Sequence, residues 1–165
     1  MEKSNNNNNI HNETVYNIIS NFIKQEIEKR DAQGVVIGMS GGIDSSLTAV
    51  LAVKALGNQQ VFGLILPDSS LTPKTDTKDA IDLAKSLKIK YKVIELNKIK
   101  KQIVTSLPKN KMARANLLVR LRMSLLYYYA TAMNLLVLGT GDKSEMMLGY
   151  FIFRKTSYYL FLYLV

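Results

Sequence analysis

The sequence predicts an α/β fold, a three-layer α/β/α arrangement in which helices cover both faces of a parallel sheet. Two observations support this prediction: short apolar runs alternate with segments of helical periodicity, and polar, glycine-rich segments follow the apolar runs 35–39 and 135–138. Strands that alternate with helices are typical of parallel sheets covered on both faces. The 165 residues, 47% hydrophobic and 21% charged, match one globular domain in size and apolar content.

The first part of the chain is expected to form a helix, a strand, a second helix and a second strand. Apolar residues recur at helical spacing over 13–30, with Asn12 as N-cap. The apolar run 35–39 predicts a buried strand, after which a helix extends to a C-cap at Gly57. Another apolar run, 61–66, predicts the second strand.

The next elements continue the alternation. A helix is expected over 75–87, a third strand over 91–96 and a weaker helix over 98–106. The longest helical segment, 111–133, leads into a fourth strand over 135–138. This order completes the pattern from which the parallel sheet is predicted.

Both ends of the chain differ in composition from the rest. Residues 1–11 are rich in asparagine and have no apolar stretch of the kind found in secretory signals, so they are expected to be a disordered tail. The apolar stretch 158–165 is far shorter than the ~20 residues that a membrane-spanning helix needs. We therefore expect a cytoplasmic protein with no membrane partner.

The composition excludes several kinds of chemistry. There is no cysteine and the single histidine is His11, which excludes disulfides, thiolate metal sites and a serine–histidine triad. The net charge of +9 predicts an anionic partner. Much of this charge lies in the acid-free stretch 96–141, and no nucleic-acid-binding motif accompanies it. A small, phosphate-rich ligand is therefore favoured over a nucleic acid.

The segment 38–46, Gly-Met-Ser-Gly-Gly-Ile-Asp-Ser-Ser, joins the first strand to its helix and has the features of a phosphate-binding loop. Gly41 and Gly42 allow the backbone N–H groups to approach an anion, and the helix N-terminus adds partial positive charge. The loop lacks the Gly-Lys-Ser/Thr of a Walker A motif. Asp44 would repel phosphate unless a cation lay between them, which suggests Mg²⁺. The alternative is a tight turn whose serines only cap the helix.

A second polar segment, 139–145, follows the fourth strand in the same way. In open parallel sheets, ligands bind outside the carboxyl ends of the strands. The segments 38–46 and 139–145 are therefore expected to meet at one edge of the sheet.

The string Ser-Gly-Gly-x-Asp-Ser at 40–45 resembles the loop of the N-type ATP pyrophosphatases, which cleave ATP between its α and β phosphates to adenylate a substrate. Other segments are similar to the ammonia-dependent NAD synthetases: Leu-Pro and Thr-Pro within 66–73, the Arg-Leu-Arg-Met helix within 115–130, and Gly-Thr-Gly-Asp-Lys-Ser-Glu with Gly-Tyr-Phe within 139–151. The resemblance extends over residues 12–151 and implies a Rossmann-like fold of the adenine nucleotide alpha hydrolase type.

This resemblance also implies an activity and a set of site residues. The family amidates deamido-NAD with ammonia: ATP first forms an acyl-adenylate and pyrophosphate, and ammonia then displaces AMP to give NAD. No side-chain nucleophile is required. Arg120 would bind deamido-NAD, Mg²⁺ would be held by Asp44 and Glu145, and the protein would be a homodimer. The residues expected to bind ATP are Gly38, Met39, Ser40, Gly41, Gly42, Ile43, Asp44, Ser45 and Thr140.

The helix over 111–133 has apolar or aromatic residues on both sides, which predicts burial on both sides. Arg120 lies on the side that carries Met123 and Tyr127, and Arg122 lies on the opposite side with Leu118. Arg120 is therefore expected to face a ligand or a second subunit.

The resemblance stops after residue 151. Phe153 and Thr156 stand where the family has a substrate-binding lysine and aspartate, and 152–165 is an atypical aromatic tail. These departures suggest a shifted or prematurely ended reading frame, with the C-terminal part of the domain missing. They leave open the alternative of a catalytically inactive nucleotide-binding remnant. The loop over 38–46 taken alone also leaves open another N-type ATP pyrophosphatase, such as GMP synthetase.

Overall fold

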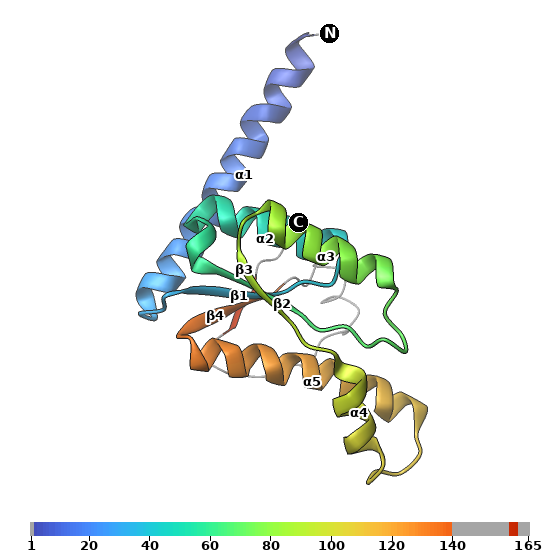
Figure 1. The fold of residues 1–165 in the computed structure, drawn as a ribbon. Helices are drawn as coiled ribbons and strands as arrows, with labels where there is room; N and C mark the ends of the chain where they lie inside the picture. The colour runs from blue at the N-terminus through green and yellow to red at the C-terminus, as the bar shows by residue number, and fades with distance from the viewer. Residues whose placement is uncertain (1, 140–158, 162–165) are drawn as a thin grey trace.

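The computed structural model describes residues 2–139 and 159–161, which form a parallel sheet flanked by helices (Figure 1). The strands pair in the order β3-β2-β1-β4-β5, and each pair of neighbours is parallel. The predicted α/β fold with a parallel sheet is thus confirmed. The strands are β1 (Gly34–Gly38), β2 (Val61–Ile65), β3 (Lys90–Val93), β4 (Leu135–Gly139) and β5 (Tyr159–Phe161).

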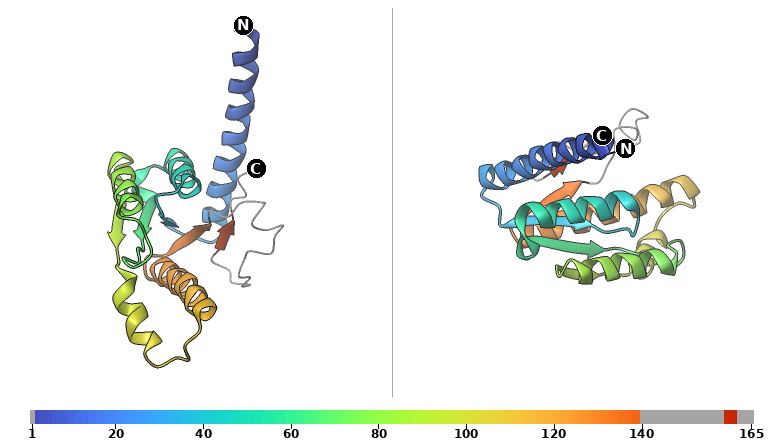
Figure 2. Two further views of the ribbon diagram at one scale, coloured as in Figure 1. Left: turned by 90° about the vertical axis from the view of Figure 1, so that its right-hand side faces the viewer. Right: turned by 90° about the horizontal axis from the view of Figure 1, so that it is seen from above.

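Helices cover both faces of the sheet, as Figures 1 and 2 show from three directions. One face carries α1 (Glu2–Lys29), α2 (Ile43–Leu56) and α3 (Lys74–Ser86). The other carries α4 (Leu96–Val104) and α5 (Lys111–Ala132). A short 3-10 turn, Asn58–Gln60, precedes β2. These layers agree with the predicted α/β/α arrangement.

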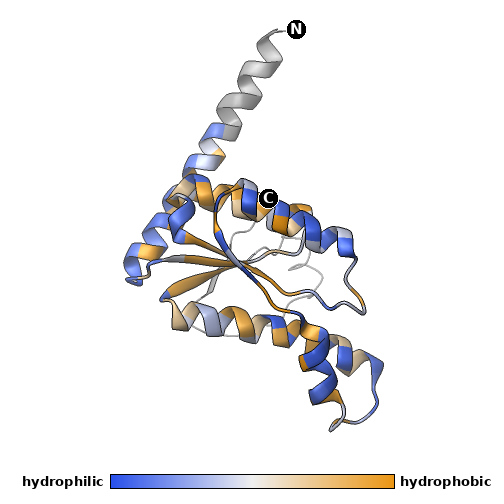
Figure 3. Ribbon diagram, in the orientation of Figure 1, coloured by the Kyte–Doolittle hydropathy of each residue, from blue (hydrophilic) through white to orange (hydrophobic). Residues whose placement is uncertain are grey.

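Successive side chains of the strands point to opposite faces of the sheet, and this produces two hydrophobic cores, one on each face. Val35 and Ile37 pack with residues of α1, α2 and α3, whereas Val36 packs with Leu118 and Leu126 of α5. Successive side chains of a strand point to opposite faces, so a strand covered on both sides has to be apolar throughout. Figure 3 shows this continuous apolar character in the central strands.

The strand order places β1 and β4 side by side, although they are far apart in the sequence. From β1 the chain adds β2 and then β3 on one side, and after α4 and α5 it returns to place β4 on the other side of β1. Ile37 is in register with Leu138, so the carboxyl ends of β1 and β4 lie together. Such a reversal of strand order is where open α/β sheets bind ligands.

Several boundaries differ from the sequence-based predictions. Helix α1 begins at Glu2 rather than near residue 13, and the expected disordered tail is helical over 2–11. This stretch contains no Gly or Pro, and extending an existing helix costs far less than nucleating one. Strand β3 ends at Val93, because Glu95 is the N-cap of α4 and accepts a hydrogen bond from the N–H of Asn97. Strand β5 was not predicted.

No helix within the described residues has the length and apolar character needed to cross a membrane.

Candidate functional site

The loop between β1 and α2 is held by hydrogen bonds among its own residues. The N–H of Ser40 donates to Oγ of Ser45 at 3.2 Å, and the two serine Oγ atoms are 3.1 Å apart. Oγ of Ser45 donates to the carbonyl of Gly42 at 3.0 Å, and the N–H of Gly42 donates to Oγ of Ser40 at 3.2 Å. The serines therefore shape the loop, and no side chain caps the start of the helix.

The first-turn N–H groups of α2 have no side-chain cap. The N-cap of the helix is Gly42, which has no side chain that could accept from the first-turn N–H groups. These groups carry the positive end of the helix dipole and are available to a phosphate. Asp44 lies in the same turn and is exposed, as is Ile43, whereas Met39 and Ser45 are buried.

At Gly41 the loop packs against the backbone of α3. Its φ of +87° is in a region that residues with a Cβ rarely adopt, and a Cβ at this position would lie 2.2 Å from the carbonyl oxygen of Asp76 in α3. A glycine is therefore required for the loop to pack closely on the backbone of α3.

A cavity of about 560 Å³ opens at the carboxyl ends of β1, β2 and β4. Most of its lining is apolar, from the strand ends and from one side of α5. The polar and charged lining residues include Ser40, Thr72, Asp76, Thr77 and Arg122. Of the residues predicted to bind ATP, the lining contains Gly38, Met39 and Ser40. The cavity thus lies at the predicted edge of the sheet, beside the loop.

Helix α5 has one buried and one exposed side, so the expectation of burial on both sides is wrong for the single chain. Arg120 lies on the exposed side together with Tyr128, which is 69% exposed. Arg122 instead lines the cavity, and its Nε donates to the carbonyl oxygen of Leu66 at 3.1 Å. Burial lowers the pKa of Arg122, and the negative charge of Asp68 partly offsets this effect. The sequence pattern favoured Arg120 and did not identify Arg122 as a cavity residue.

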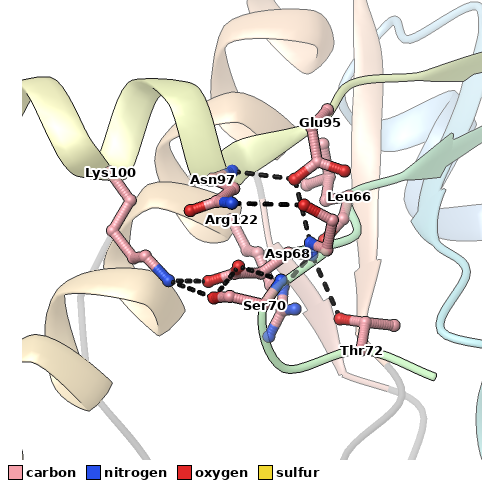
Figure 4. Close-up of polar contacts among 9 residues, drawn as sticks. Leu66, Asp68, Ser70, Thr72, Glu95, Asn97, Lys100 and Arg122 are labelled. Atoms are coloured by element: carbon pink, nitrogen blue, oxygen red, sulfur yellow. Dashed lines mark hydrogen bonds and ion pairs between the residues drawn. The ribbon is translucent and has the colours of Figure 1, made fainter.

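A polar network next to the cavity centres on Asp68, which follows the carboxyl end of β2 and is fully buried (Figure 4). Its carboxylate forms an ion pair with Lys100 of α4 and accepts a hydrogen bond from the N–H of Ser70 at 3.0 Å. Oε1 of Glu95 accepts from the N–H groups of Ser69, at 3.0 Å, and Asn97, at 2.9 Å. The network therefore joins the loop after β2 to the start of α4. No sequence pattern relates these residues, because they lie on separate elements.

Two predicted residues, Thr140 and Glu145, lie outside the described residues, as do the Gly-Tyr-Phe segment and most of the tail over 152–165. Within 13–139, where side chains are described, no cluster of three or more acidic or histidine side chains could hold a metal ion. Asp44 is the predicted metal ligand that the structure places, and its exposed carboxylate suits a hard cation such as Mg²⁺.

Comparison with known families agrees with this geometry. A family model described as NAD synthase matches residues 15–154. The chain belongs to the NAD synthase family. The resemblance inferred from the loop and the Arg-Leu-Arg-Met helix is thereby confirmed.

Curated relatives include the NH(3)-dependent NAD(+) synthetases of Pyrobaculum aerophilum, 47% identical over 143 residues, and of Methanosarcina acetivorans, 46% identical over 143 residues. Each match covers 84% of this chain but only 53% and 56% of the relative. The chain therefore spans about half the length of the curated NAD synthetases that it matches.

Solved structures show the same fold. An NH3-dependent NAD synthetase from Campylobacter jejuni superposes with a TM-score of 0.77 at 38% identity, over 84% of this chain and 60% of that one. An NMN synthetase from Francisella tularensis gives a TM-score of 0.78 at 33% identity, over 84% and 58% of the two chains. The Rossmann-like fold of this NAD synthase family member is thus supported by its structural neighbours.

Glu95 stabilises this NAD synthase fold where α4 begins. The hydrogen bond from the N–H of Ser69 lowers the pKa of Glu95 most, and that from Asn97 adds to the effect. Replacing Glu95 with alanine should lower the free energy of unfolding by about 1–2 kcal/mol, because two backbone donors lose a charged acceptor. Urea unfolding followed by circular dichroism would measure this change. Glu28→Ala, at an exposed site on α1, should change it by less than about 0.5 kcal/mol; an equal effect of both substitutions would contradict the prediction.

Proposed function

We propose that this protein amidates deamido-NAD to NAD, with ATP and ammonia as co-substrates. One observation carries the proposal. In a chain of the NAD synthase family, a glycine- and serine-rich loop follows β1 beside a cavity at the point where the strand order reverses. Curated relatives bear the name NH(3)-dependent NAD(+) synthetase. The activity of the 165-residue chain, which spans about half of these relatives, is part of the proposal.

In this proposal the loop over 38–45 binds the phosphates of ATP. The first-turn N–H groups of α2 are open to an anion because the N-cap, Gly42, has no side chain. Thr140 is proposed to contact ATP, and Asp44 and Glu145 are proposed to hold Mg²⁺. When bound, the cation neutralises phosphate charge. The chain's own contribution is to hold the α-phosphate in line with the incoming carboxylate.

The proposed reaction has two steps, and neither uses a side-chain nucleophile. A carboxylate oxygen of deamido-NAD forms a bond to the α-phosphorus of ATP while the bond to pyrophosphate breaks. Ammonia then attacks the carbonyl carbon of the acyl-adenylate, AMP leaves with the bonding electron pair, and the nitrogen loses a proton. The absence of cysteine from the chain is compatible with both steps.

Arg120 is proposed to bind deamido-NAD, and α5 is proposed to form a homodimer. Arg120 and Tyr128 lie on the exposed side of α5, and Met112, at the start of the helix, is 73% exposed. This surface is suited to a ligand held between subunits or to a second copy of the chain. We also propose a cytoplasmic location, with no nucleic-acid or membrane partner.

The activity can be tested with the 165-residue chain, ATP, Mg²⁺, deamido-NAD and ammonium, with AMP and NAD quantified by chromatography. We expect AMP and NAD to form in equal amounts. Asp44→Asn should lower the rate at least about 100-fold, because stabilisation of phosphate charge by a metal ion is worth several kcal/mol.

A matched control for the charge change is Asp82→Asn, since Asp82 is exposed on α3, away from the loop. Its rate should equal that of the unmodified chain. Binding of ATP without formation of AMP would contradict the proposal and would favour an inactive nucleotide-binding protein.

A further inference from the structure

An ion pair between Asp68 and Lys100 lies next to the cavity, behind the turn that follows β2. Asp68 has no exposed surface, and the side chain of Lys100 is 16% exposed. Neither residue is among those that line the cavity. Burying a charge is unfavourable unless it is paired and hydrogen-bonded, so the buried carboxylate of Asp68 depends on its partly buried partner Lys100.

Asp68 organises the turn that forms one wall of the cavity. Its carbonyl oxygen accepts from the N–H groups of Leu71, at 2.8 Å, and Thr72, at 2.7 Å, and its N–H donates to Oγ1 of Thr72 at 3.1 Å. Its carboxylate accepts from both the N–H and the hydroxyl of Ser70. Leu71, Thr72 and Pro73 line the cavity directly. The position of this wall therefore depends on Asp68.

Lys100 connects the turn to α4. Its Nζ reaches the second carboxylate oxygen of Asp68 and also donates to Oγ of Ser70 at 2.9 Å (Figure 4). The backbone adds a further link, because the N–H of Leu96 donates to the carbonyl of Pro67 at 2.8 Å. The turn is thus held by a helix that begins about thirty residues later in the chain.

The same carboxylate acts on Arg122. The Nε of Arg122 is bonded to the carbonyl of Leu66, two residues before Asp68, so the guanidinium and the turn share one stretch of backbone. The charge of Asp68 favours the protonated guanidinium against the effect of burial. A substitution at Asp68 or Lys100 would therefore alter both the turn over 67–73, which forms one wall of the cavity, and the position of the Arg122 guanidinium.

We propose that Asp68 and Lys100 are positioning residues: their ion pair holds the turn over 67–73 and, through it, Arg122 in the geometry that the cavity needs to bind its ligand. Neither residue lines the cavity, so their effect on the ligand would be indirect. This inference rests on the proposed function in one respect, that ATP is a ligand of this site.

The test compares Lys100→Met with Lys101→Met, a matched control at the next, exposed lysine of α4. ATP binding in the presence of Mg²⁺ would be measured by calorimetry, well below the unfolding temperature of every variant. We expect Lys100→Met to raise the Kd for ATP about tenfold, as is typical when a group that orients a binding residue is lost. Lys101→Met should leave the Kd unchanged, and Lys100→Arg, which keeps the charge, should restore most of the affinity. An unchanged Kd in Lys100→Met would overturn the inference.

Amide hydrogen exchange provides a readout that needs no ligand. In Lys100→Met the amides of Ser70, Leu71 and Thr72 should exchange faster, while those of Val36 and Ile37 in the core of the sheet keep their protection. Unchanged exchange in the turn would overturn the inference whether or not the chain binds ATP. If the unmodified chain binds no ATP, the proposed function is contradicted, and the exchange measurement still decides the positioning role.

Discussion

Gly41→Ala is expected to destabilise the protein by more than about 3 kcal/mol and to abolish nucleotide binding. Two effects add up at this position. A residue with a Cβ at φ +87° costs of the order of 1–3 kcal/mol, and the new Cβ would lie 2.2 Å from the backbone oxygen of Asp76. Because that oxygen belongs to the backbone of a helix, the loop has to move away from α3, which displaces the N–H groups that would receive phosphate.

Gly57→Ala separates the two effects. Gly57 has a similar φ of +82°, and a Cβ there would meet no atom within 4 Å. This variant should show the backbone cost alone, about 1–3 kcal/mol, and should keep its affinity for ATP. Denaturant unfolding would give the stabilities, and calorimetry at a temperature where both variants are folded would give the affinities. Equal losses of stability and of ATP affinity in the two variants would show that the contact with Asp76 is unimportant.

The second large effect is expected at Asp68. Asp68→Ala should lower the free energy of unfolding at neutral pH by about 3–5 kcal/mol, because it removes one partner of a buried ion pair and leaves Lys100 without a counter-charge. Chemical unfolding followed by circular dichroism would measure the loss. Asp82→Ala, at an exposed position of α3, should change the stability by less than about 0.5 kcal/mol.

The stabilisation by Asp68 should depend on pH in a defined direction. Burial alone would raise the pKa of Asp68, but hydrogen bonds from Lys100 and Ser70 outweigh it and hold the pKa below its ordinary value. A carboxylate whose pKa is lower in the folded protein contributes fully above its unfolded pKa of about 4 and loses this contribution as the pH falls through the folded value. The difference between the unmodified chain and Asp68→Ala should therefore be constant near neutrality and narrow below about pH 4. A difference that does not change with pH would contradict the ionic origin of the stabilisation.

Local patterns were sufficient to predict strands β1, β2 and β4 and the tight glycine- and serine-rich loop that follows β1. A strand buried on both faces needs an uninterrupted apolar run, and the runs over 35–39 and 135–138 match β1 and β4 to within one residue at each end. The loop was predictable because tight turns and anion contacts need Gly and Ser at fixed offsets. The adjacency of the strand ends followed from a general rule about parallel sheets, and the register of Ile37 with Leu138 agrees with it.

Features that depend on how distant segments meet could not be predicted. Helix α5 carries apolar residues on both sides, so the sequence did not show which side would face the sheet. In the folded protein the side of α5 that carries Leu118 and Leu126 packs against the sheet. This orientation places Arg122, rather than Arg120, at the cavity. The pairing of Asp68 with Lys100 could not be predicted either, because no sequence periodicity relates residues on separate elements. The helical state of residues 2–11 depends on continuation from the packed part of α1, which the weak propensity of Asn alone does not indicate.

The position of β1 in the centre of the sheet has a consequence for the newly made chain. Gly34 of β1 pairs with Leu135 of β4, so one edge of β1 stays open until about a hundred further residues have left the ribosome. At about 5–20 residues per second, this interval lasts on the order of 5–20 s. During that time Val35, Val36 and Ile37, all fully buried in the finished protein, form an unpaired apolar edge. Such an edge can pair with other chains, so aggregation of the nascent chain is favoured during this interval.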